Sequence, residues 1–190
     1  MGSPKALLAF GPETMLQRVV RLLDTVVSSV VVVAAPGQPL PELPGTVTVA
    51  RDEREGRGPL EGLRAGLLAL PDPLDVAYVT SCDVPLLVPG FVRRMLELAD
   101  GHDVAVLETD GFAHPLAAVY RRRTLPRIEA LLAADRLRPV FLFEAARTRR
   151  VAPREVADAD PELLTLRNVN TPEDYAEALS AAGLGSSHPR

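Results

Sequence analysis

The spacing of apolar residues divides the chain into alternating strands and helices. Residues 12–27 carry them at helical spacing, whereas residues 30–35 form an unbroken, mostly β-branched run, the pattern of a strand buried on both faces. Further strands are expected at 46–50, 76–80, 103–107 and 116–120, edge strands at 150–152 and 164–169, and helices at 59–70, 89–99, 125–134, 139–146 and 172–182. This alternation predicts an α/β fold in which a mostly parallel sheet has helices on both faces.

The domain organisation is expected to be simple. The chain has 190 residues, enough for one sizeable domain, and shows no repeat or linker. We expect a single domain over residues 1–182, followed by a flexible tail at 183–190, because the tail residues are mainly small or polar.

Composition excludes several classes of protein. A hydrophobic fraction of 47% supports a full core. A net charge of −4 without a basic block argues against a nucleic-acid binder. Apolar runs fall short of the roughly 20 residues of a membrane span, and no signal peptide is recognisable. The single cysteine, Cys82, rules out an internal disulfide and indicates the cytoplasm.

An aspartate directly after an expected strand is the first candidate for chemistry. Residues 76–80 form the strand, and Asp83 follows in the sequence Ser-Cys-Asp-Val-Pro. Ligands of open parallel sheets bind at the carboxyl ends of the strands, and one carboxylate there suits Mg²⁺, which keeps its other positions for water and phosphate. The residues alone leave a turn cap equally open, since aspartate is common in turns.

Two further segments have residues suited to a nucleotide. Lys5 is the only lysine, and its compact charge suits phosphate. The alternative is that this lysine remains by chance in a sequence that favours arginine. Asp52 follows a short strand, and a glycine-bounded loop at 56–62 leads into a helix. Free N–H groups at such a helix start suit an anion or the polar edge of a base, and the alternative is a capped surface turn.

Two other turns contain candidate substrate contacts. His114 lies in a hairpin-like turn, where it would donate a hydrogen bond to substrate or serve only as a turn residue. Thr171 and Asp174 fit the capping of a helix whose first residue is a proline. That cap leaves Asn168 and Asn170 unexplained, and both point to the same side of a strand end.

The order of these motifs resembles the molybdenum cofactor guanylyltransferase (MobA-like) family of nucleotidyltransferases. The shared motifs are M-G-x-P-K-x-L-L, G-P-L-x-G-L, C-D-x-P, H-P-L and N-V-N-T-P-E-D, which together span Met1 to about Ala178. The resemblance implies a three-layer α/β/α nucleotide-binding fold of the nucleotide-diphospho-sugar transferase type. It also implies transfer of GMP from GTP to the phosphate of molybdopterin, or of the molybdenum cofactor, with release of pyrophosphate.

The resemblance also assigns roles to residues. Lys5 is similar to the phosphate-binding lysine, and Asp83 to the Mg²⁺ ligand. The nucleotide-binding residues it implies are Lys5, Asp52, Gly58, Pro59, Leu60, Gly62 and Asp83. His114, Asn168 and Asn170 are implied as substrate contacts, the two asparagines on the pterin side or in the surroundings of the metal. Contacts with other proteins of the cofactor pathway are implied as well.

The chain departs from the family pattern at its start. Members carry a first strand and a glycine-rich segment directly before the M-G-x-x-K motif, and the resemblance places that strand near the middle of the sheet. Two explanations stay open. Either the working protein begins upstream of Met1, or the chain is short and its nucleotide site is damaged. Two other functions also stay open, a cytidylyltransferase or related transferase, and a non-catalytic accessory protein.

Overall fold

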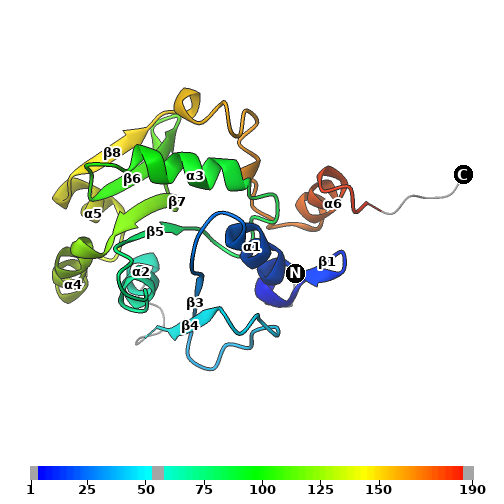
Figure 1. The fold of residues 1–190 in the computed structure, drawn as a ribbon, viewed down its shortest axis with the longest axis horizontal. Helices are drawn as coiled ribbons and strands as arrows, with labels where there is room; N and C mark the ends of the chain where they lie inside the picture. Colours follow the sequence, from blue (N-terminus) through cyan, green and yellow to red (C-terminus); the bar gives the residue numbers. More distant parts are fainter. Residues whose placement is uncertain (1–3, 53–57, 186–190) are drawn as a thin grey trace, which may run out of the picture.

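The computed structural model describes residues 4–52 and 58–185, and its elements alternate as expected (Figure 1). The strands are β1 (Ala9–Phe10), β2 (Glu13–Thr14), β3 (Val31–Ala34), β4 (Thr48–Arg51), β5 (Val76–Val79), β6 (Val104–Thr109), β7 (Phe112–Arg121) and β8 (Thr148–Val151). The α-helices are α1 (Met15–Asp24), α2 (Pro59–Leu68), α3 (Pro89–Leu98), α4 (Leu125–Ala133), α5 (Val140–Ala145) and α6 (Pro172–Ala181). Short 3₁₀ turns occupy Lys5–Leu7, Arg122–Thr124, Pro153–Glu155 and Leu164–Leu166.

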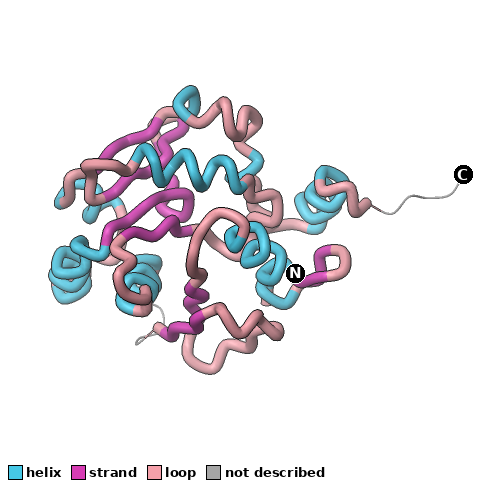
Figure 2. The backbone as a smooth tube through the Cα atoms, viewed as in Figure 1, coloured by secondary structure: helices cyan, strands magenta, loops and turns pink. Residues whose placement is uncertain are grey.

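The strands form a mixed arrangement. Four of them pair in the order β5-β7-β6-β8, in which β7 is antiparallel to both neighbours and β8 is parallel to β6. β3 and β4 pair in parallel and lie apart from these four strands (Figure 2). Because β5 and β6 are both antiparallel to β7, they run in the same direction.

Helices cover both faces of the four-stranded sheet, which gives the three expected layers. Val104 and Val106 of β6 pack in one cluster with α2, α4 and α5. Ala105 and Leu107 point to the opposite face and pack against α3, since neighbouring side chains of a strand alternate between its faces. Figure 1 shows α3 on one side of the sheet and α2 and α4 on the other.

Two expectations about single elements were wrong. Residues 164–169 form no strand but a 3₁₀ turn at Leu164–Leu166, because the buried Asp160 carboxylate accepts from the Leu164 and Thr165 amides at 2.8 and 2.9 Å and holds the backbone in a turn. The first helix begins at Met15 rather than at residue 12, because residues 9–14 form the small β1–β2 hairpin.

Segments from the two ends of the chain lie side by side. The Tyr175 hydroxyl of α6 donates to the Ala9 carbonyl at 2.7 Å, and its ring packs edge-on against Phe10. Leu184 also packs against the cluster of buried residues that contains Phe10. The single domain and the flexible tail stay predictions, and residues 186–190 lie outside the described part of the chain. None of the helices in that part is long and apolar enough to cross a membrane.

Candidate active site

Asp83 lies at the carboxyl end of β5 and gathers three side chains around its carboxylate. Its Oδ2 accepts from Lys5 Nζ at 2.8 Å. Its Oδ1 accepts from Asn168 Nδ2 at 3.1 Å and from the Ser81 hydroxyl. The structure therefore brings together residues that are 78 and 85 positions apart in the sequence.

The start of α6 positions the two asparagines. Lys5 Nζ also donates to Asn170 Oδ1 at 2.5 Å, so the ammonium bridges Asp83 and Asn170. The Val169 amide donates to the Asp83 carbonyl at 2.8 Å, which fixes the segment between the asparagines against the end of β5. Asp174 accepts from the Asn170 and Thr171 amides at 2.9 Å and completes the expected cap.

The electrostatics of Asp83 favour its charged form. Burial by itself would raise the pKa of Asp83. Hydrogen bonds and one positive charge outweigh this effect of burial. The bonds come from Lys5, Ser81 and Asn168, and the charge is that of Lys5, so the pKa of Asp83 lies below its usual value. Asp83 is therefore an anion at neutral pH, poised beside a cation.

The oxygens of this cluster suit a magnesium ion. Within residues 4–52 and 58–185, no three His, Cys, Asp or Glu side chains gather that would hold a metal by themselves. Mg²⁺ needs fewer protein ligands, because it keeps several waters and shares substrate phosphates. The Asp83 and Asn170 oxygens already share one cation, the Lys5 ammonium, at 2.8 and 2.5 Å. This donor set fits a Mg²⁺ ion that arrives with a nucleotide.

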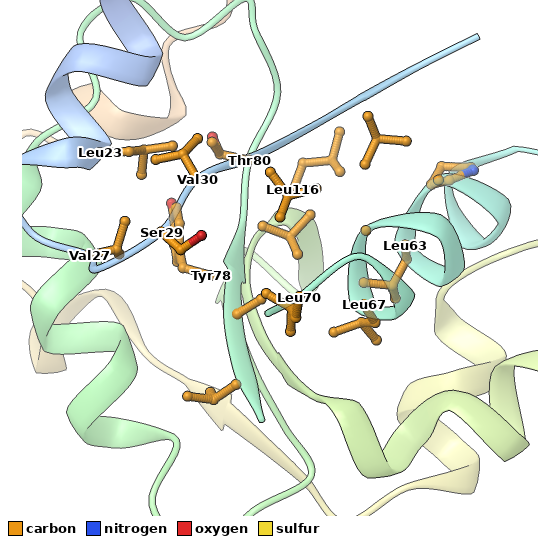
Figure 3. A pocket seen from close by; sticks show the side chains of 18 of the residues that line it. Leu23, Val27, Ser29, Val30, Leu63, Leu67, Leu70, Tyr78, Thr80 and Leu116 are labelled. Atoms are coloured by element: carbon orange, nitrogen blue, oxygen red, sulfur yellow. The ribbon is translucent and has the colours of Figure 1, made fainter. Parts of the chain in front are cut away.

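Asp52 and the start of α2 border a cavity of about 650 Å³. Asp52 follows β4, and its Oδ1 is buried without a hydrogen-bond partner. Burial, and secondarily the charge of Glu61, raise the pKa of Asp52. An ideal Cβ on Gly62 would lie 3.6 Å from that oxygen, an ordinary van der Waals distance, and Gly58 and Pro59 line the same cavity as Asp52 (Figure 3). Asp52 therefore has an unpaired acceptor oxygen beside the cavity wall.

The remaining expected contact lies elsewhere. His114 Nε2 is 2.6 Å from Thr109 Oγ1, a contact between the paired strands β6 and β7. Burial lowers the pKa of His114, which favours the neutral ring. The described contacts of His114 do not reach Asp83, Lys5 or the asparagines. Leu60, also among the expected nucleotide-binding residues, is fully buried in the core.

Sequence reasoning missed one supporting residue of the site, Ser81, whose hydroxyl donates to the Asp83 carboxylate. Its signal was present, as a hydroxyl two residues before the aspartate. Asp174 was expected only as part of a helix cap, and it also fixes the backbone of Asn170. Parts of two motifs, Gly2 and the pair Gly56 and Arg57, lie outside the described residues.

The α/β fold, together with the cluster of Lys5, Asp83 and Asn170, is that of a nucleotidyltransferase. The chain is similar in structure to molybdopterin-guanine dinucleotide biosynthesis protein A from Archaeoglobus fulgidus, with a TM-score of 0.77 at 17% identity over 96% of this chain and 92% of that one. It is also similar to 2-C-methyl-D-erythritol 4-phosphate cytidylyltransferase from Thermus thermophilus, with a TM-score of 0.71 at 19% identity over 96% and 95% of the two chains. At these identities the similarity shows the fold alone.

Sequence relatives show the family. Residues 1–150 match the MobA-like NTP transferase domain. A probable molybdenum cofactor guanylyltransferase from Methanosarcina acetivorans is 37% identical over 93% of this chain and 83% of its own length. A molybdenum cofactor guanylyltransferase from Desulfosudis oleivorans is 31% identical over 97% and 90% of the two chains. The chain therefore belongs to the MobA-like NTP transferase family.

Proposed function

We propose that this protein is a molybdenum cofactor guanylyltransferase that transfers GMP from GTP to the terminal phosphate of molybdopterin or its molybdenum-loaded form. The observation that carries the proposal is the Lys5 ammonium held between Asp83 and Asn170 at the carboxyl end of β5. Sequence relatives that bear the name of this activity support the choice of reaction.

The reaction needs charge neutralisation more than acid–base catalysis. An oxygen of the acceptor phosphate attacks the α-phosphorus of GTP, and the bond from that phosphorus to the bridging oxygen of the β-phosphate breaks. The bonding electrons leave with pyrophosphate. Because the acceptor phosphate is already an anion near neutral pH, no general base is required. Positioning and electrostatic stabilisation then supply most of the catalysis.

Residues of the cluster divide this task. Lys5 neutralises charge on the departing pyrophosphate. Asp83 and the Asn170 oxygen would hold Mg²⁺, which would offset charge on the nucleotide phosphates when bound. Ser81 and Asn168 donate to Asp83 and keep its carboxylate oriented. Asn168 and Asn170 are proposed on the acceptor side, and His114, which lies outside this cluster, is proposed as a further substrate contact.

Guanine recognition is proposed at the cavity wall. The guanine edge presents an exocyclic N–H₂ donor, and the unpartnered Asp52 oxygen is an acceptor. Gly58, Pro59 and Gly62 line the same cavity as Asp52, in which we propose that the base lies. We also propose that the protein works in the cytoplasm, which its single cysteine favours.

An assay of pyrophosphate release tests the reaction. Purified protein would be incubated with molybdopterin, Mg²⁺ and labelled GTP, with parallel reactions that contain CTP or EDTA. We expect pyrophosphate and a labelled guanylyl product with GTP only, and none with EDTA. A preference for CTP would favour the cytidylyltransferase. Absence of both turnover and tight Mg·GTP binding would instead favour the non-catalytic accessory protein.

A further inference from the structure

One side chain of α1 reaches the loop that follows Asp83. Arg18 Nε donates to the Pro85 carbonyl at 2.7 Å, and a hydrogen bond from a charged donor is stronger than a neutral one. Within residues 4–52 and 58–185, it is the only hydrogen bond between α1 and residues 80–88. Only 16% of the Arg18 side chain is exposed, so its guanidinium is committed to partners inside the protein.

Two residues of the β1–β2 hairpin hold the Arg18 guanidinium in one orientation. Glu13 accepts from its Nη1 at 3.4 Å, and the Phe10 ring lies against it, with Cζ 4.9 Å from the ring centroid. A cation over an aromatic face is attracted by the ring, and Phe10 is fully buried. Arginine suits this position because its planar group can stack and donate hydrogen bonds together. The hairpin therefore aims Arg18 at the Pro85 carbonyl.

The loop that Arg18 contacts belongs to the candidate active site. The Asp83 carbonyl accepts from the Val169 amide at 2.8 Å. Leu86, one residue after Pro85, packs with Val169 in one buried cluster. The backbone from Asp83 to Leu86 is therefore fixed at three points, and Arg18 supplies the middle one.

The same helix also positions Lys5. Ala6, the next residue, packs in one buried cluster with Leu16 of α1. The helix is thus packed against the turn that carries Lys5 and bonded through Arg18 to the loop that carries Asp83. A rigid helix in contact with both segments sets the distance at which the ammonium and the carboxylate meet, which is 2.8 Å.

We propose that Arg18 is a positioning residue of the candidate active site, which holds Asp83 where its carboxylate can share the Lys5 ammonium and the metal of a bound nucleotide. This role rests on the transferase activity proposed above. Arg18 acts through the backbone at Pro85 and does not touch the reacting atoms. Misplacement of a reacting group by about 1 Å can cost roughly 100-fold in rate, so a small relaxation of this loop would slow the chemical step.

Arg21 is a matched control on the same helix. It donates to the same Glu13 carboxylate at 2.6 and 3.1 Å, and 54% of its side chain is exposed. Among the described residues it makes no hydrogen bond to Pro85. Loss of Arg21 therefore removes an ion pair from the hairpin and leaves the bond from Arg18 to the loop in place.

Kinetics of pyrophosphate release would compare Arg18→Met, Arg18→Lys and Arg21→Met with the wild type. We expect Arg18→Met to lower kcat about 10- to 100-fold with a nearly unchanged KM for GTP, because the base is bound elsewhere. The Mg²⁺ concentration that gives half the maximal rate should rise. Arg18→Lys should recover part of kcat, since its ammonium can donate to the carbonyl but lacks the planar fork. Arg21→Met should keep the wild-type kcat.

Amide hydrogen exchange tests the contact without use of any activity. The Val169 amide donates to the Asp83 carbonyl, so its exchange rate reports how firmly the loop is held. We expect this amide to exchange at least about fivefold faster in Arg18→Met, because local opening becomes easier, and at the wild-type rate in Arg21→Met. The Gln17 amide, which is capped at the start of α1, serves as the internal reference.

The two measurements separate this role from the proposed function. Slower turnover together with faster Val169 exchange, in Arg18→Met but not in Arg21→Met, would support the positioning role. A change in only one readout, in neither, or equally in both variants would overturn it. If Arg18→Met did not fold, wild-type kcat and exchange in Arg18→Lys would overturn the need for a guanidinium. If the wild type released no pyrophosphate, the proposed function would fail, and Val169 exchange would still decide whether Arg18 holds the loop.

Discussion

Replacement of Asp83 by asparagine removes the negative charge around which the candidate site is built. Asparagine keeps the size of the side chain but turns one oxygen into an N–H₂ donor, which must face either the Lys5 ammonium or the donors Ser81 and Asn168. Hydrogen bonds to charged groups contribute about 1.5–3 kcal/mol. If Asp83→Asn lowers the stabilisation of the transition state by the energy of one such hydrogen bond, kcat/KM for GTP falls about 10- to 150-fold.

The pH dependence of stability gives an independent measure of the same carboxylate. Because the folded-state pKa of Asp83 is lowered, its contribution to stability is present above the unfolded value of about 3.9. It is lost as the pH falls through the folded pKa. The difference in unfolding free energy between wild type and Asp83→Asn should therefore be largest at neutral pH and shrink in acid, as urea titrations would measure.

Asp103 offers a matched control at the opposite end of the sheet. It precedes β6, whereas Asp83 follows β5, and these strands run in the same direction. Its carboxylate accepts from Arg123 Nε at 2.5 Å and from the Arg147 amide at 3.1 Å. Asp103→Asn should lower the unfolding free energy by about 1–3 kcal/mol and leave kcat/KM nearly unchanged. Equal kinetic losses in both variants, or full activity of Asp83→Asn, would refute the assignment.

Four further variants test three other residues. Lys5→Met should reduce pyrophosphate release about 10- to 100-fold, with partial recovery in Lys5→Arg, because only the charge returns. Asp52→Asn should weaken GTP binding more than CTP binding. Since the pKa of Asp52 is raised, wild-type GTP affinity should fall as the pH drops from neutral through that raised pKa, and calorimetry across the acid range should show no such fall in the variant. Phe91→Ala should cost about 3–5 kcal/mol of unfolding free energy in urea, because this ring is fully buried against Tyr78.

Most helices and strands could be predicted because local patterns specify them. The β-branched run at 30–35 became β3, and the proline-led helix starts at Pro59 and Pro172 were confirmed. The hairpin expected near His114 joins β6 to β7 through Asp110 and Gly111, which both have positive φ. Glycine and aspartate tolerate that conformation better than most residues, so this turn could be predicted from the sequence.

Errors arose where tertiary contacts override local preference. The segment 164–169 has a strand-like composition, but Asp160 satisfies its backbone amides in a turn. The β1–β2 hairpin is too short for a periodic signal, and Tyr175 from the far end of the chain fixes it.

Local sequence patterns specify the alternating elements, their caps and the residue types suited to phosphate and metal, because these depend on neighbours within a few positions. Long-range packing is what lets Lys5 bridge Asp83 and Asn170, which are 78 and 165 residues away from it. It also makes β3 and β5 face a shared cavity. Such pairings depend on how strands order in a sheet, and that order is set by packing between distant segments rather than by local periodicity.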